Sequence, residues 1–119
     1  MLHIDSTKFG SVVIDGKKYR DILIIGQKII PRNYDLLKEK YGSGHKIASW
    51  ELNLLLKENP EIIIIANGQN GVLQIDQIIE EKIKNENIKL LILKTPEAIK
   101  KYNQLIKNNK VNILIHTTC

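Results

Sequence analysis

The chain has 119 residues, of which 43% are hydrophobic and 26% are charged, and its formal net charge at pH 7 is +5. This composition is typical of a globular protein whose single hydrophobic core needs neither disulfides nor a metal. The basic excess is spread along the chain and aromatic residues are few, which argues against nucleic-acid binding. No apolar run approaches the roughly 20 residues that span a bilayer, and no signal-peptide pattern opens the chain, so we expect a cytoplasmic protein without a membrane span.

Residues 1–31 predict a β-rich N-terminal portion. Asp15-Gly16 separates two apolar runs, and this dipeptide between β-type segments is a strong signal for a hairpin. Phe9 is expected to close the small core beneath that hairpin. The strands expected here lie at 11–14, 19–25 and 28–30.

Residues 49–119 predict alternating helices and strands. The run from Ile62 to Ile65 is β-branched throughout and lies between a proline and a Gly/Asn loop, which is typical of a strand buried on both faces. Helices are expected after the cap-type residues Ser49, Asp76 and Thr95. The apolar stripe expected on the second of these helices is Ile75, Ile78, Ile79 and Ile83. The expected strands are 62–66, 89–93 and 111–115.

The order of these elements favours one α/β domain over residues 1–119. Strand, helix, strand, helix and strand alternate in the second half, and this order indicates a largely parallel sheet. The β-rich N-terminal portion precedes it, and 34–41 is expected to form a short helical turn. No linker, repeat or low-complexity segment divides the chain.

Several short motifs occur in order along nearly the whole chain. They are Phe9-Gly10, Ile14-Asp15-Gly16 with Tyr19 and Asp21, His45, Thr95-Pro96-Glu97-Ala98 followed by Tyr102-Asn103, and His116-Thr117-Thr118-Cys119. Together they resemble a family of small domains that includes an adipogenesis-associated protein and a mitochondrial complex I assembly factor of animals. The resemblance implies a three-layer α/β fold with a mixed central sheet, and a role in assembly instead of catalysis. Members usually carry Gly-Thr-Gly at the end of the central strand, where this chain has Ala66-Asn67-Gly68.

The glycine loop 67–71 is the first candidate for a binding site. Its main-chain N–H groups could hold an anion, although the loop matches neither the dinucleotide-binding fingerprint nor the P-loop. If strands 62–66 and 89–93 are parallel, Asn67 and Thr95 emerge at the same edge of the sheet. A tight exit from the strand, without any ligand, is the alternative interpretation.

Other residues extend this candidate site. Arg32 follows a strand end and could pair with a carboxylate or a phosphate. The direction of the last strand decides whether His116 and Cys119 reach the same edge. The candidate ligand-binding residues are Arg32, His45, Asn67, Gly68, Gly71 and Thr95.

The sequence shows no convincing catalytic set, so we expect no catalytic residue, no metal and no cofactor. His116 and Cys119 point to opposite faces of an extended chain, and no third metal ligand accompanies them. Cys119 is the only cysteine, which excludes an internal disulfide and favours a reducing compartment.

Two functional hypotheses follow. The first is a non-catalytic cytoplasmic protein-interaction or assembly-factor domain with protein partners. The second is a small-molecule or anion-binding protein, or an enzyme, that uses the crevice at the end of the central strands. A homodimer through the isoleucine-rich strand edges stays open under either hypothesis.

Overall fold

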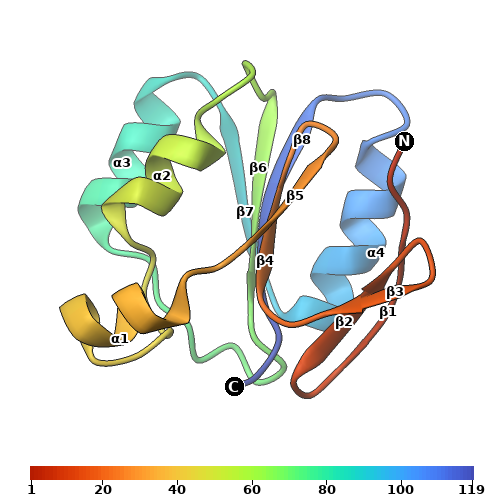
Figure 1. The fold of residues 1–119 in the computed structure, drawn as a ribbon. Coiled ribbons are helices and arrows are strands. Elements are labelled where there is room, and N and C mark those ends of the chain that lie inside the picture. Colours follow the sequence, from red (N-terminus) through yellow and green to blue (C-terminus); the bar gives the residue numbers. More distant parts are fainter.

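Two β-sheets and four helices build the computed structural model, which describes residues 1–119 (Figure 1). The antiparallel small sheet has the order β1 (Ile4–Lys8), β2 (Ser11–Ile14) and β3 (Lys17–Tyr19). The central sheet has the order β5 (Lys28–Pro31), β4 (Ile22–Ile25), β8 (Val111–His116), β6 (Ile62–Asn67) and β7 (Lys89–Leu93). The helices are α1 (Tyr34–Tyr41), α2 (Ser49–Leu55), α3 (Gln77–Asn85) and α4 (Thr95–Leu105). None of the helices is long and apolar enough to cross a membrane.

The central sheet is mixed, and the prediction that it is largely parallel is wrong. Strand β6 pairs in parallel with β7 and β8, whereas β4 pairs antiparallel with β8 and β5. The Gly26-Gln27 turn between β4 and β5 is too short for a crossover, and such turns join only antiparallel strands. The helical alternation that favours parallel pairing exists only from β6 onward, so it describes only half of the sheet.

The N-terminal portion departs from the prediction at two places. The expected strand 19–25 is wrong as a single element, because the chain leaves the small sheet after Tyr19 and enters the central sheet at Ile22. Strand β1 was not predicted, and Phe9 lies in the turn that follows it with 63% of its surface exposed. The prediction that Phe9 closes the small core is therefore wrong.

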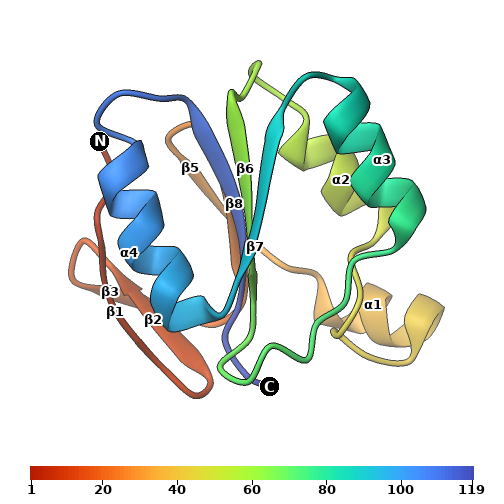
Figure 2. The same ribbon diagram turned by 180° about the vertical axis from the view of Figure 1, so that it is seen from behind.

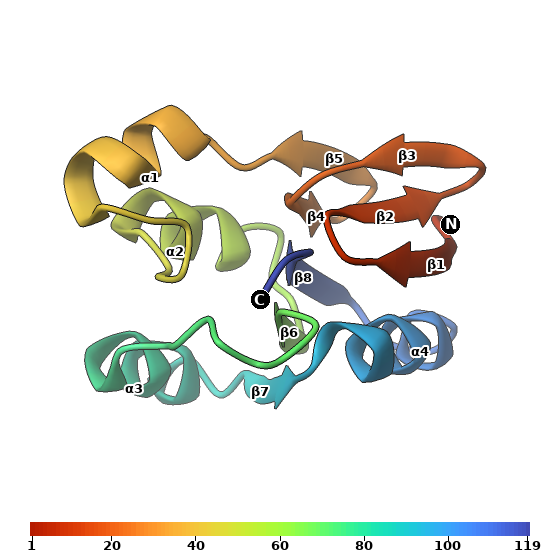
Figure 3. The ribbon, with the colours of Figure 1, turned by 90° about the horizontal axis from the view of Figure 1, so that it is seen from below.

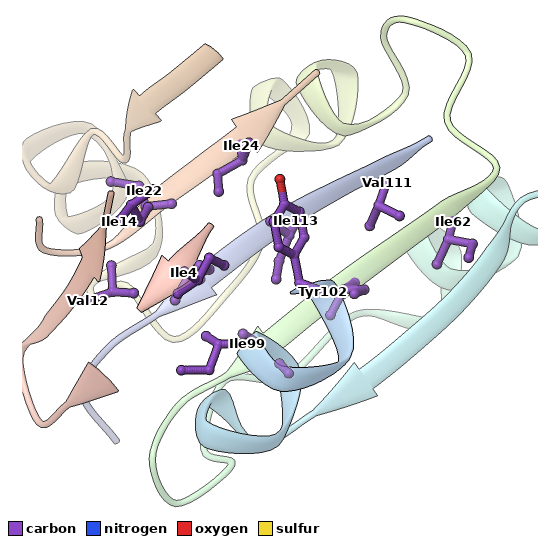
Figure 4. Packing of buried hydrophobic residues seen from close by; sticks show 14 residues of the cluster. Ile4, Val12, Ile14, Ile22, Ile24, Ile62, Ile99, Tyr102, Val111 and Ile113 are labelled. Atoms are coloured by element: carbon purple, nitrogen blue, oxygen red, sulfur yellow. The ribbon is translucent and has the colours of Figure 1, made fainter. Parts of the chain in front are cut away.

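Side chains from both faces of the central sheet are buried. Helices α1, α2 and α3 lie on one side of the sheet, and α4 lies with the small sheet on the other (Figures 2 and 3). The core on the α4 side contains 14 buried residues, ten of which are labelled in Figure 4. They include Ile62 and Ile64, whereas Ile63 and Ile65 belong to the core on the α2 and α3 side. The prediction that the isoleucine run is buried on both faces is confirmed.

The prediction that Asp76 is the N-cap of α3 is confirmed, whereas Ser49 is the first residue of α2, one position after the N-cap Ala48. Thr95 is the first residue of α4 and not its N-cap, because its hydroxyl is used in bonds to neighbouring strand ends. The stripe expected on α3 is wrong at Ile78, which is 67% exposed, and right at Ile83, which is buried. Asn103 ties α4 to β1 through hydrogen bonds of 2.9 and 2.8 Å with the main chain of Ile4.

Two isoleucine-to-alanine substitutions test this packing. We expect Ile64→Ala to lower the free energy of unfolding by about 2–5 kcal/mol, because Ile64 is fully buried and its loss leaves a cavity. Ile78→Ala is the matched control, and we expect a change within about 0.5 kcal/mol because that side chain is mostly exposed. Urea denaturation measures both, and equal effects would contradict the described packing.

Candidate functional site

The strand directions bring five polar residues to one edge of the central sheet, here called the carboxyl edge: Asp21, Arg32, Asn67, Thr95 and His116. Strands β6, β7 and β8 run in the same direction, so their C-terminal ends lie side by side, and Asn67 pairs with His116 in the register. Strand β4 runs the opposite way and contributes its beginning, whereas β5 reverses again and contributes its end. Because β8 runs parallel to β6, His116 at the end of β8 lies at this edge, beside Asn67.

Arg32 is fully buried, and each of its five N–H donors is used within the chain. Its Nε and Nη2 atoms donate to the two carboxylate oxygens of Glu51 at 2.6 and 3.0 Å. Its Nη1 atom donates to Asp21 at 3.0 Å and to the main-chain oxygen of Gly44 at 2.9 Å, and Nη2 also donates to that of Lys46 at 2.8 Å. Burial alone would lower the pKa of Arg32, but the two carboxylates outweigh it and raise that pKa. A ligand can bind this guanidinium only by displacing one of these bonds.

Asp21 joins the beginning of β4 to the end of β8. One carboxylate oxygen lies 3.0 Å from Nη1 of Arg32 and 2.6 Å from Nδ1 of His116, and the other accepts from the N–H and hydroxyl of Thr117 at 2.6 and 2.7 Å. Burial alone would raise the pKa of Asp21, but the hydrogen bonds and charge of these neighbours hold it well below its usual range. An ionised carboxylate accepts only, so Nδ1 of His116 carries a proton.

A hydrogen-bonded series runs from the carboxylate of Asp21 through the imidazole of His116 to the hydroxyl of Thr118, in the same order of groups as in a hydrolase triad. Nε2 of His116 lies 3.2 Å from the hydroxyl oxygen of Thr118, opposite the bond to Asp21. Such a series can pass a proton only if a substrate reaches the hydroxyl. None of the four hollows in the structure is lined by these three residues. The geometry supports a structural connection between strand ends.

Thr95 connects three segments at this edge. Its hydroxyl accepts from the N–H of Gly68 at 3.0 Å and donates to the main-chain oxygen of His116 at 2.6 Å. Its own N–H donates to the main-chain oxygen of Gly68 at 3.0 Å. The hydroxyl therefore fixes the ends of β6 and β8 to the start of α4.

The glycine loop is filled by the segment that follows β8. The N–H of Gln69 donates to the oxygen of Thr118 at 2.7 Å, and those of Asn70 and Val72 donate to the oxygen of Cys119 at 2.9 and 3.1 Å. Gly68 has a φ of +108°, and a Cβ added there would lie 2.3 Å from the carbonyl carbon of Cys119. Only glycine fits this close approach. The N–H groups expected to hold an anion already have acceptors.

All six predicted ligand-binding residues lie at or beside the carboxyl edge, although they do not line one hollow. Arg32 and Thr95 are buried, and the ring of His45 meets that of His116 edge-on at 5.2 Å. The Oδ1 atom of Asn67 is buried and has no hydrogen-bond partner, and a Cβ on Gly71 would lie 3.5 Å from it.

Sequence reasoning missed Asp21, Glu51 and Thr117 as members of this arrangement. A signal existed for Asp21, since it directly precedes an apolar run, as Asn67 directly follows one. Glu51 gave no such signal, because an acidic residue in the first turn of a helix usually faces solvent. Its carboxylate instead accepts from the N–H of Ala48 at 3.0 Å while it holds Arg32.

The hollows lie away from the glycine loop. One of about 270 Å³ lies at the opposite end of β8, lined in part by Met1, Tyr102 and Asn112. Burial raises the pKa of that tyrosine to about 12. A second, of about 180 Å³, lies among apolar residues of β4, β5 and α2 and touches Arg32 and Glu51. A third, of about 340 Å³, follows β7 and α4. A fourth, of about 260 Å³, is lined in part by Asn59.

The chain matches, over residues 4–116, a family described as a protein of unknown function (DUF498/DUF598), and it belongs to this family. It is similar to the crystal structure of a conserved hypothetical protein from Pyrococcus horikoshii OT3, with 29% identity and a TM-score of 0.86 over 98% of each chain. It is also similar to a solved protein named MT938, with 34% identity and a TM-score of 0.80 over the whole of both chains. An outer membrane protein from Bartonella henselae shares the fold at 18% identity, with a TM-score of 0.79 over 98% of this chain and 94% of that chain. No curated protein matches the chain.

Gly68→Ala tests the close approach of the terminal segment. We expect it to displace residues 118–119, because the new Cβ overlaps the main chain of Cys119. The amides of Gln69, Asn70 and Val72 should then lose protection in hydrogen exchange, with a larger stability loss than in the control. The control is Gly42→Ala, which has a φ of +78° but open space around the new Cβ, and should cost only about 1–2 kcal/mol of backbone strain. Unchanged amide protection in Gly68→Ala would refute the described packing.

The pH dependence of Asp21→Asn tests the buried carboxylate. Near neutral pH we expect this variant to be about 3–5 kcal/mol less stable than the wild type, because it leaves buried donors and a buried cation unpaired. The folded-state pKa of Asp21 lies below the unfolded value, so its stabilisation is present above about pH 4 and is lost as the pH falls toward the folded-state value.

The stability difference between wild type and Asp21→Asn should therefore shrink by about 1.4 kcal/mol per pH unit below about pH 4. Urea denaturation over an acidic pH series measures it. Asp35→Asn, at an exposed position in the first turn of α1, is the control and should show a small effect. A difference that stays constant through the acidic range would contradict an ionised, buried Asp21.

Proposed function

We propose that this chain is a non-catalytic cytoplasmic protein-interaction or assembly-factor domain that acts as a single unit of 119 residues. The observation that carries the proposal is the saturation of Arg32, whose five donors are all used by carboxylates and main-chain oxygens of the same chain. A guanidinium that recognises a ligand keeps at least part of its donor fork open. In this chain the guanidinium supports the architecture.

The sequence motifs support the same proposal. Their order resembles the family that includes an animal complex I assembly factor, and an assembly role requires a stable surface more than an open pocket. The single cysteine, Cys119, is unpaired, which supports a reducing compartment such as the cytoplasm. The predicted three-layer arrangement fits this role, because helices on both faces of a sheet leave its lateral edges for partners.

One observation favours a second candidate function at the carboxyl edge. The buried Oδ1 atom of Asn67 has no partner, and such an acceptor favours a group that donates a hydrogen bond. A small molecule with a hydroxyl or amine that reached Asn67 would satisfy it. A small anion fits less well, because it would meet this acceptor and the oxygens that already fill the glycine loop.

Two experiments distinguish the two functions: a titration of isotope-labelled protein with small molecules, and chemical cross-linking in a lysate. We expect titration with inorganic phosphate, and separately with a panel of small polyols and amines, to give no saturable shifts of the amides at 67–71. We also expect chemical cross-linking in a lysate of the source organism, read by mass spectrometry, to join the chain to a reproducible protein partner.

His45→Ala with Asn67→Ala provides the matched variant for this experiment, because neither side chain takes part in the buried bonds of Arg32. The variant should keep the cross-linked partner. Saturable binding of a small molecule to the wild type, abolished in this variant and accompanied by no protein partner, would overturn the proposal.

A further inference from the structure

Strand β7 is a lateral edge of the central sheet with one open side. It pairs only with β6 and is the last strand in the sheet order. The N–H groups of Lys89 and Thr95 donate toward the β6 side, to Glu61 and Gly68. Since main-chain groups alternate in direction along a strand, the N–H and C=O groups of Leu90 and Ile92 point away from β6. These four groups are available to another strand.

A groove runs beside this open edge. It has a volume of about 340 Å³ and is lined by residues of β7 and α4. These two elements follow one another along the chain, as Figure 2 shows. Leu91 and Leu93 contribute its apolar side and are only partly buried, although both also pack against the core on the α4 side. Ile92 is 38% exposed on the other face of the strand. The lining residues are Leu91, Leu93, Glu97, Lys100, Lys101 and Gln104.

The charges around the groove are mainly positive. Lys100 and Lys101 line it, and Lys89 and Lys94 are exposed at the two ends of β7. None of these four lysines forms an ion pair within the chain, and Glu97 is the one acidic residue in the lining. Lysines on an edge strand also oppose pairing between identical edges, because two copies would bring like charges together. The charge pattern therefore fits an acidic partner better than a second copy of this chain.

We propose that β7 and this groove bind an extended segment of a partner protein in which apolar and acidic side chains alternate. The segment adds to the sheet as a further strand, bonded to the main chain of Leu90 and Ile92. Alternate side chains of an added strand point to opposite faces of the sheet. The carboxylates of the segment lie on the α4 face, over the groove, where they reach Lys100 and Lys101. Its apolar side chains lie on the other face and cover Ile92, which is 38% exposed. This proposal rests on the proposed function and names the chemistry of the partner.

A defined peptide tests the proposal. The probe is a fluorescein-labelled peptide of alternating valine and glutamate, blocked at both ends, and the control probe replaces each glutamate with lysine. We expect saturable binding of the acidic probe by fluorescence anisotropy, weakening with added salt, and little binding of the basic probe. Amide shifts of isotope-labelled protein should map the acidic probe to β7 and α4.

Two substitutions at one position isolate the main-chain contribution. Ile92→Pro removes an N–H that points away from β6, so the ladder between β6 and β7 keeps its bonds. Ile92→Thr keeps that N–H and is the matched control. We expect the proline variant to weaken binding of the acidic probe by about tenfold and the threonine variant to stay within about threefold. Circular dichroism and amide spectra verify that both variants are folded.

Two charge reversals isolate the electrostatic contribution. Lys100→Glu with Lys101→Glu should weaken binding by about tenfold and remove most of its salt dependence. Lys38→Glu with Lys40→Glu changes the net charge equally, but on α1, and should leave binding nearly unchanged. Comparison of these two double variants distinguishes binding at the groove from a general effect of net charge.

Three results with the purified protein would overturn this inference. They are no saturable binding of the acidic probe, equal binding of the basic probe, or a wild-type dimer that Ile92→Pro dissociates. Sedimentation velocity detects such a dimer, and its loss in Ile92→Pro would show that a second copy of this chain binds at β7. A cross-linked partner that maps to another surface defeats only this inference. A small molecule that saturates the carboxyl edge without any protein partner defeats the proposed function itself.

Discussion

The carboxyl edge depends on how the buried charge of Arg32 is neutralised. A buried guanidinium loses hydration worth several kcal/mol, and only well-placed acceptors offset that cost. Here the acceptors come from the start of β4, the first turn of α2 and the loop before α2. If any of these segments moves, a charged group is left buried without its partner. The relative positions of β4, β5, α2 and the loop before α2 are therefore constrained by one side chain.

Asp21 extends this constraint to the second half of the chain. Its carboxylate binds Arg32 on one side and His116 and Thr117 on the other, across 95 and 96 residues of sequence. The segment after β8 fills the glycine loop, and the main-chain oxygen of His116 at the end of β8 accepts a hydrogen bond from the hydroxyl of Thr95. The β-rich portion, the helical layers and the end of the chain thus meet through a few short hydrogen bonds, which closes this edge of the sheet.

The two kinds of sheet edge differ in what they offer a partner. At the carboxyl edge, every buried side-chain donor and acceptor except the Oδ1 atom of Asn67 has a hydrogen-bond partner within the chain. At the lateral edge, β7 has unpaired main-chain groups beside a groove with two lysines. The glycine loop after a buried strand makes the carboxyl edge the first place to expect a ligand, but only the lateral edge has main-chain groups free to pair with another strand.

The sequence by itself determined the elements whose signals are local: the isoleucine strand β6, the Asp15-Gly16 turn and the start of α4 within one residue. It also predicted that Asn67 and Thr95 emerge at the same edge of the sheet, provided that β6 and β7 are parallel, as they are. Propensity and periodicity act within a strand or a helical turn, so they could not show that the apolar run from Tyr19 is divided between two sheets or that Phe9 stays exposed. Only the tertiary structure decided that β8 lies between β4 and β6, and thereby that Asp21 meets His116. The physical reason is that a buried carboxylate takes partners from whichever strands the sheet order places beside it, and that order depends on the packing of the whole chain.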